Sequence, residues 1–174
     1  MLKYTDFLLI ENFEKELDSF VLNEDIFHPI KTKRIKNALK KYVKAEVEVA
    51  RFDTESQKRI DKVEGKEAKE KLKQALDKKK EVAQDRIAQI DDTLTANATT
   101  DSLKDLVTYG KAAAKEKALD IRAKAEDDLA KKIELEDKIK KTKEVMKTKA
   151  EEIKTAVKTD KKNKDSENKD SENQ

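Results

Sequence analysis

Residues 95–102, with the sequence TANATTDS, interrupt a chain that otherwise follows a helical pattern over most of its length. Threonine and asparagine are poor helix formers, so a helix that arrives from the N-terminal side is expected to end here. Thr100, Asp101 and Ser102 belong to the residue types that cap the first turn of a helix. The stretch therefore predicts a turn between two helices, the second of which begins at about Leu103.

The apolar residues after this turn recur at steps of four and three, with Gly110 and Thr142 in two of the positions. They occupy positions 103, 107, 110, 114, 118, 121, 125 and 129 and, after a three-residue phase slip, positions 135, 139, 142, 146, 150, 153 and 157. Four- and three-residue steps that repeat every eleven residues give about 3.67 residues per turn, which predicts nearly straight or slightly right-handed packing.

The residues before the turn also have apolar side chains at helical spacing, from Ile35 to Leu94. This stripe is thin and rich in Lys and Glu near Gly65, where we expect a weak point. Two arms of similar length joined by a short loop fold back on each other most simply as an antiparallel hairpin. We therefore predict an all-α protein in which a short amphipathic helix precedes a long, coiled-coil-like helical hairpin and a disordered C-terminal tail.

The composition agrees with this fold class and excludes several others. Of the 174 residues, 45% are charged and 36% hydrophobic, and two glycines and one proline are too few for a strand-rich fold. The chain has no cysteine, which excludes disulfides and thiol chemistry. The longest apolar run near the N-terminus, residues 7–10, is far shorter than a membrane span or a secretory signal. We expect no integral membrane association and a cytoplasmic location in the producing cell.

The chain divides into four segments by pattern and charge. Residues 1–24 form an acidic amphipathic helix, residues 25–31 a linker around Pro29, and residues 32–158 the hairpin, whereas residues 159–174 form the polar tail. The tail repeats the sequence NKDSE at 163–167 and 168–172 without an apolar residue, so it cannot bury enough surface to fold.

No catalytic, cofactor-binding or metal-binding set is recognisable. The single histidine, His28, lies beside Pro29 with no second imidazole in the chain. The acidic pairs at 91–92 and 127–128 belong to lysine-rich helices, where a solvated surface is the expected role. The two glycines stand alone and form no phosphate-binding loop. We therefore expect a protein that is not an enzyme.

A basic run follows the linker and contrasts with the acidic N-terminus. Between residues 31 and 44 the chain has seven positive charges and no acid, whereas residues 1–24 have a net charge of −4. Such a helix suits non-specific contact with the phosphates of DNA, an anionic membrane surface, or simply a solvated end of the rod. The candidate phosphate-binding residues are Lys31, Lys33, Arg34, Lys36, Lys40, Lys41 and Lys44.

The first eleven residues, MLKYTDFLLIE, carry a lysine, a tyrosine, an acid and a phenylalanine, followed by aliphatic residues and a glutamate. This order resembles the capsid-targeting prefix of internal head and prohead core proteins of T-even-type bacteriophages. The resemblance is confined to the N-terminal segment, and Leu2 is one residue more than the usual prefix has. The residues that fill comparable positions are Lys3, Tyr4, Asp6, Phe7, Ile10 and Glu11.

The resemblance implies a role in the interior of a phage head. In that family a prohead protease cuts after a glutamate that is preceded two residues earlier by leucine or isoleucine, and two such sites occur here, Leu9 with Glu11 and Leu22 with Glu24. Removal of residues 1–24 would leave a body with a net charge of about +7. The implied partners are further copies of the chain, capsid or core proteins and non-specifically bound DNA, in the host cytoplasm during assembly and then in the virion head.

The leading hypothesis is therefore a phage structural protein of the prohead interior, either a core or scaffold component or a packaged internal protein. Two alternatives stay open. The chain could be a coiled-coil adaptor or stalk that binds a partner through its N-terminal helix, or a hydrophilic stress-type protein rich in Lys, Glu and Ala.

Overall fold

A computed structural model describes residues 2–20 and 29–171 of the chain, except the side chains of residue 57 and of residues 157–171. The described residues form helices and no strand, which confirms the predicted all-α class. The helices are α1 (Tyr4–Ser19), α3 (Pro29–Asp61), α4 (Lys66–Asn97), α5 (Asp101–Ala125) and α6 (Leu129–Ser171).

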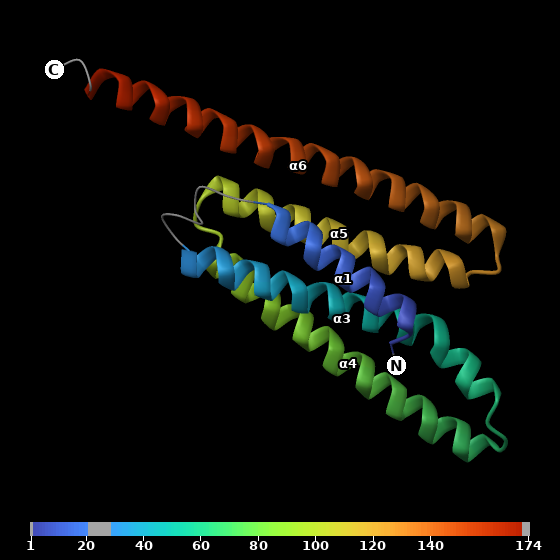
Figure 1. The fold of residues 1–174 in the computed structure, drawn as a ribbon. Helices are drawn as coiled ribbons and strands as arrows, with labels where there is room; N and C mark the ends of the chain where they lie inside the picture. The colour runs from blue at the N-terminus through green and yellow to red at the C-terminus, as the bar shows by residue number, and fades with distance from the viewer. Residues whose placement is uncertain (1, 21–28, 172–174) are drawn as a thin grey trace.

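Four of the helices lie side by side in the order α4, α3, α5, α6, and α1 lies across α3 and α5 (Figure 1). The central pair, α3 and α5, run in the same direction, whereas α4 and α6 return along the two outer edges. The apolar stripes of all these helices meet in one core that also includes α1. The N-terminal helix is therefore packed against the body of the protein.

The close approach of α3 to α5 depends on a glycine. A side chain of even one carbon at Gly110 would come within 2.6 Å of the methyl groups of Leu39, which is fully buried. Around this contact α5 contributes small residues, among them Ala113, Ala114 and Ala118, which are completely buried. Small side chains let two helix backbones approach closely, and α5 packs against α3 in this way.

The predicted turn at 95–102 is confirmed. Helix α4 ends at Asn97, and the hydroxyl of Thr100 accepts a hydrogen bond of 3.3 Å from the amide of Leu103, so that Thr100 caps α5 as expected. The chain starts α3 earlier than predicted, at Pro29 instead of residue 32, because proline is well tolerated in the first turn of a helix.

The arms on both sides of this turn differ from the predicted two-helix hairpin, because each arm is itself folded into a hairpin. The first arm breaks between Asp61 and Lys66, where Gly65 has a φ of +88°, a conformation that favours glycine. The second breaks between Ala125 and Leu129, where the Asp128 carboxylate accepts hydrogen bonds from two amides of α6. This second break lies just before the phase slip between positions 129 and 135. Because both arms are broken, the bundle has twice the expected number of long helices.

Beyond Ile153, none of the described side chains of α6 belongs to the core. The last residue in the core cluster is Ile153 in α6. Beyond it α6 extends past the other helices to Ser171 (Figure 1). Among the described helices none is both long and apolar enough to cross a membrane.

Candidate interaction site on the N-terminal helix

The N-terminal helix α1 binds the body of the protein through one apolar face. Its buried side chains are Ile10, Phe13 and Leu17, and Phe20 continues the row just after the helix ends. The ring of Phe20 meets Tyr109 of α5 edge-on with a centroid distance of 4.9 Å, and the ammonium group of Lys117 lies 5.6 Å from the centre of the Phe13 ring. Steps of three and four residues place these groups on one side of a helix.

An ion pair holds the first turn of α1 to α3. The carboxylate of Asp6 is completely buried and accepts hydrogen bonds from Nε (2.8 Å) and Nη2 (2.5 Å) of Arg51. Its Oδ2 atom also accepts a hydrogen bond of 2.7 Å from the backbone amide of Lys3, which caps the helix. A paired arginine fork and an amide satisfy a carboxylate that would otherwise be costly to bury. We call this pair the Asp6–Arg51 clasp.

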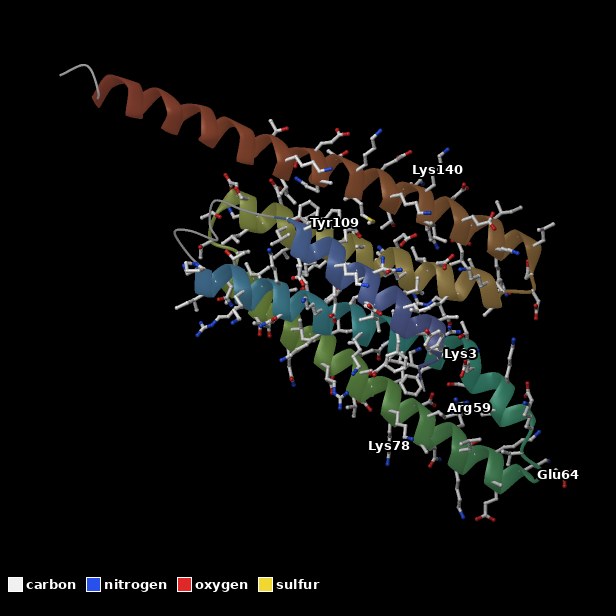
Figure 2. All side chains as sticks on the ribbon, in the orientation of Figure 1. Lys3, Arg59, Glu64, Lys78, Tyr109 and Lys140 are labelled. Carbon is white, nitrogen blue, oxygen red and sulfur yellow. The ribbon has the colours of Figure 1, made fainter. Side chains whose placement is uncertain are left out.

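Further charges extend the clasp along α3. The ammonium group of Lys3 lies 2.8 Å from Oε1 of Glu55, and Glu55 also pairs with Arg59 one turn later, at 3.2 Å. Figure 2 shows Lys3 at the end of α1, close to α3, with Arg59 farther toward the tip of the α3–α4 hairpin. The pairs with Lys3 and Arg59 are partly exposed, so they add less to stability than the buried clasp does.

The start of α1 also carries apolar side chains that face away from the body. Tyr4 is 77% exposed, Phe7 55% and Leu8 41%. In this helix an acid points inward while two aromatic rings and a leucine point outward, which is the reverse of the ordinary rule of burial. The sequence predicted one amphipathic pattern from these apolar residues; the structure divides them into two faces because the clasp fixes the rotation of α1. We call Tyr4, Phe7 and Leu8 the outer patch.

The C-terminal end of α1 covers part of the basic run. Lys36 donates a hydrogen bond of 2.6 Å to the carbonyl oxygen of Phe20, and Lys40 forms an ion pair of 2.8 Å with Asp18. Close by, the hydroxyl of Tyr109 donates to the carboxylate of Glu16 (the position of Tyr109 is labelled in Figure 2). One carboxylate of the acidic helix thus pairs with Lys40, and the backbone carbonyl just after the helix binds Lys36.

The structure separates the predicted phosphate-binding residues into two groups. Lys36 and Lys40 contact α1, and Lys31 donates to the hydroxyl of Thr99 at the end of α4, at 3.3 Å. The remaining four are exposed on the outer side of α3: Lys33, Arg34, Lys41 and Lys44. The basic run is therefore not one uniform surface.

The residues of the predicted targeting prefix are likewise divided between two faces. Asp6 and Ile10 point into the body, whereas Tyr4, Phe7 and Glu11 are exposed. Of the two predicted cleavage sites, Leu9 and Glu11 lie within helix α1, so a protease would have to unwind the helix to reach the bond. The second site, Leu22 and Glu24, lies outside the described residues, as does His28.

Two residues that hold α1 in place, Arg51 and Tyr109, could not be identified from the sequence. Arg51 lies beside the apolar stripe of α3 among many other charges, and nothing in its spacing marks it as the partner of Asp6. Tyr109 precedes Gly110 in the eleven-residue pattern but carried no distinct signal. Within the described part of the chain no group of three or more His, Cys, Asp or Glu side chains could hold a metal ion.

The clasp predicts that docking of α1 weakens in acid. Burial raises the pKa of Asp6, but the hydrogen bonds from Arg51 and from the Lys3 amide outweigh this, so the pKa lies below its ordinary value of 3.8. A lowered pKa in the folded state means that the stabilisation is complete above the unfolded pKa and is lost as the pH falls through the folded one. Glu55, whose pKa is also lowered, acts in the same direction.

The NMR signals of the Ile10 and Leu17 methyl groups should therefore be constant at near-neutral pH and move toward those of an undocked helix below a pH of about 4. In the variant Asp6→Asn the same signals should show no such transition. A transition centred at near-neutral pH would contradict this assignment.

No protein-family model, no curated protein and no solved structure matches this chain.

Proposed function

We propose that the chain is a non-enzymatic assembly protein that uses α1 as its docking element and the helical bundle as its body. The observation that carries the proposal is the orientation of α1, which buries the charged Asp6 and presents Tyr4, Phe7 and Leu8 to the outside. Exposed aromatic and aliphatic side chains gathered on one helix turn are typical of a protein-binding surface. A helix that needed only to pack on its own body would bury these groups.

The resemblance of the prefix to phage internal head proteins gives this assembly a location, the interior of a prohead. Under this proposal the outer patch binds capsid or core proteins, copies of the body pack against one another, and a maturation protease then removes the prefix. A core or scaffold component and a packaged internal protein are the two versions of the proposal. The alternative of a coiled-coil adaptor uses the same outer patch on a single protein partner and requires no cleavage.

The outer patch can be tested without disturbing the fold. The variant Tyr4→Ser/Phe7→Ser should keep its helicity and lose less than about 1 kcal/mol of stability, because both side chains are largely exposed. Incorporation of the variant into head particles, measured by quantitative mass spectrometry of purified particles, should fall at least tenfold. The control Leu129→Ser/Ile133→Ser removes two exposed apolar residues from α6 and should be incorporated normally.

The same particles also test the cleavage and separate the alternatives. Mass spectrometry of the N-terminus should show a chain that begins at Asp25 or, after the first site alone, at Asn12. A chain that still begins at Met1 in mature particles would contradict processing. Normal incorporation of the Tyr4→Ser/Phe7→Ser variant would contradict targeting, and loss of a single stoichiometric partner would favour the adaptor. A largely unfolded circular dichroism spectrum in plain buffer would instead favour the stress-type protein.

A further inference from the structure

The exposed side of the α3–α4 hairpin contains two adjoining open cavities of about 310 and 290 Å³. Both are lined by Glu48 of α3 and by Arg86 of α4, so together they form one continuous groove between the two helices. The residues that line the groove include five cations and a single acid, Glu48. Its cations are Lys41 and Lys44 from α3 and Lys78, Lys79 and Arg86 from α4.

The helical repeat explains why these side chains meet. Lys41, Lys44 and Glu48 follow one another at steps of three and four residues along α3, and Lys79 and Arg86 are seven residues, or two turns, apart along α4. The acids of α4 fall on another side of that helix; Asp91, for example, points toward α5 and forms an ion pair with Lys111. Segregation of the acids leaves the groove strongly positive.

The five cations of the groove have no partner among the described residues. None of the five forms an ion pair or a side-chain hydrogen bond with another described residue. The neighbouring Lys80, in contrast, pairs with Asp53 at 2.5 Å, and Lys36 and Lys40 are bound by α1. Unpaired positive charges gathered in one groove favour an anionic ligand from outside the chain.

The geometry of the groove favours a ligand with a row of charges. Lys41 and Lys44 are about 4.5 Å apart along the axis of α3, and Lys79 and Arg86 about 10 Å apart along α4. Successive phosphates of one DNA strand are 3.4 Å apart along the helix axis, so these distances correspond to about one to three phosphate steps. A row of phosphates could therefore meet several of these cations at once. The apolar floor offers little to a membrane, because Ala83 is 2% exposed and Val82, at 50%, is its one strongly exposed apolar residue.

We propose that the α3–α4 groove binds the phosphate backbone of nucleic acid without sequence preference. Lys44, Lys79 and Arg86 contact phosphates of the backbone, and Lys41 and Lys78 extend the site at its two ends. The exposed Lys33 and Arg34 continue the positive surface toward the start of α3. The proposal does not rest on the role of α1, since none of the groove residues forms an ion pair or hydrogen bond with that helix.

The test compares two triple variants of the full chain with equal changes in charge. Lys44→Gln/Lys79→Gln/Arg86→Gln removes three groove cations, and Lys140→Gln/Lys141→Gln/Lys147→Gln removes three exposed cations from α6 (the position of Lys140 is labelled in Figure 2). Binding to a DNA duplex of about 20 base pairs is measured by fluorescence anisotropy between roughly 50 and 200 mM salt. Circular dichroism verifies that both variants keep the helicity of the parent.

The groove variant should bind at least tenfold more weakly than the parent, and the slope of log K against log salt should fall by about three. The α6 variant should change the affinity by less than about twofold, and duplexes of different sequence should bind equally well. An equal loss in both variants would overturn the proposal, because it would indicate attraction by net charge alone. The proposal would also be overturned if the parent protein did not bind DNA. If the parent instead bound anionic lipid vesicles and the groove variant did not, the groove would be a lipid-binding site.

Discussion

Replacing Asp6 with asparagine should release α1 from the body of the protein. The substitution leaves the guanidinium group of Arg51 without its carboxylate partner in a largely buried position, and breaking a buried ion pair in this way costs about 3–5 kcal/mol. Hydrogen exchange of the α1 amides, followed by mass spectrometry, should therefore accelerate about 100-fold or more, because each 1.4 kcal/mol corresponds to a factor of ten. The amides of α5 should exchange at the rate of the parent.

Two further variants show whether the effect comes from the pair itself. The double variant Asp6→Leu/Arg51→Met replaces both partners with apolar groups of similar size, and such replacements are often neutral or stabilising. It should regain most of the protection that Asp6→Asn loses. The control Glu11→Gln removes an exposed acid that pairs with Lys15 on the same helix and should leave protection unchanged within a factor of about two. A double variant as poorly protected as Asp6→Asn would show that the clasp does not hold α1.

Replacing Leu39 with alanine should destabilise the whole bundle, because Leu39 fills the contact between its two central helices. Its side chain is completely buried and lies against Gly110, which has no side chain that could move into the space. Removal of a buried leucine side chain costs about 2–5 kcal/mol, and more when the site cannot collapse. For a chain of this size, in which each kcal/mol shifts the melting temperature by about 2–4 °C, the melting temperature should fall by about 4–20 °C.

The matched control for this prediction is Leu129→Ala, the same chemical change at a residue that is 72% exposed. Its free energy of unfolding should change by less than about 0.5 kcal/mol, as measured by urea denaturation. Equal effects of the two substitutions would contradict the packing of α3 on α5. The comparison isolates burial, because both residues are leucines in helices of the same bundle.

The central turn and the buried positions of α5 follow from local chemistry and were predicted correctly. The turn at 95–102 appears where the helix formers end and Thr100 caps the next helix. The apolar positions of the eleven-residue pattern from 103 to 121 are all buried in α5. Those from 135 to 150 are partly buried in α6, and Ile153 is fully buried.

The breaks within the two arms show where prediction became incomplete. Gly65 and the phase slip before position 135 are both visible in the sequence, but each is equally compatible with an irregularity within a longer helix. A glycine within a helix costs about 1 kcal/mol, which a long helix can tolerate. Each arm folds back because α3, α5 and their outer neighbours then bury a common apolar core. The free energy gained by this burial depends on all of these helices together and cannot be read from either segment alone.

The helical character of the chain, the place of its central turn and the order of its acidic and basic segments follow from local interactions, because capping, helix propensity and charge act over a few neighbouring residues. The packing of the helices, in contrast, turns Asp6 inward and the aromatic Tyr4 and Phe7 outward. It also brings Lys44 and Arg86 into one groove, whereas Lys36 and Lys40 are bound by α1. These outcomes depend on partners far away in the chain, such as the 45 residues that separate Asp6 from Arg51. Because 45% of the residues are charged, the sequence is compatible with many other pairings of the same charges, and the packing of the helices determines which of them form.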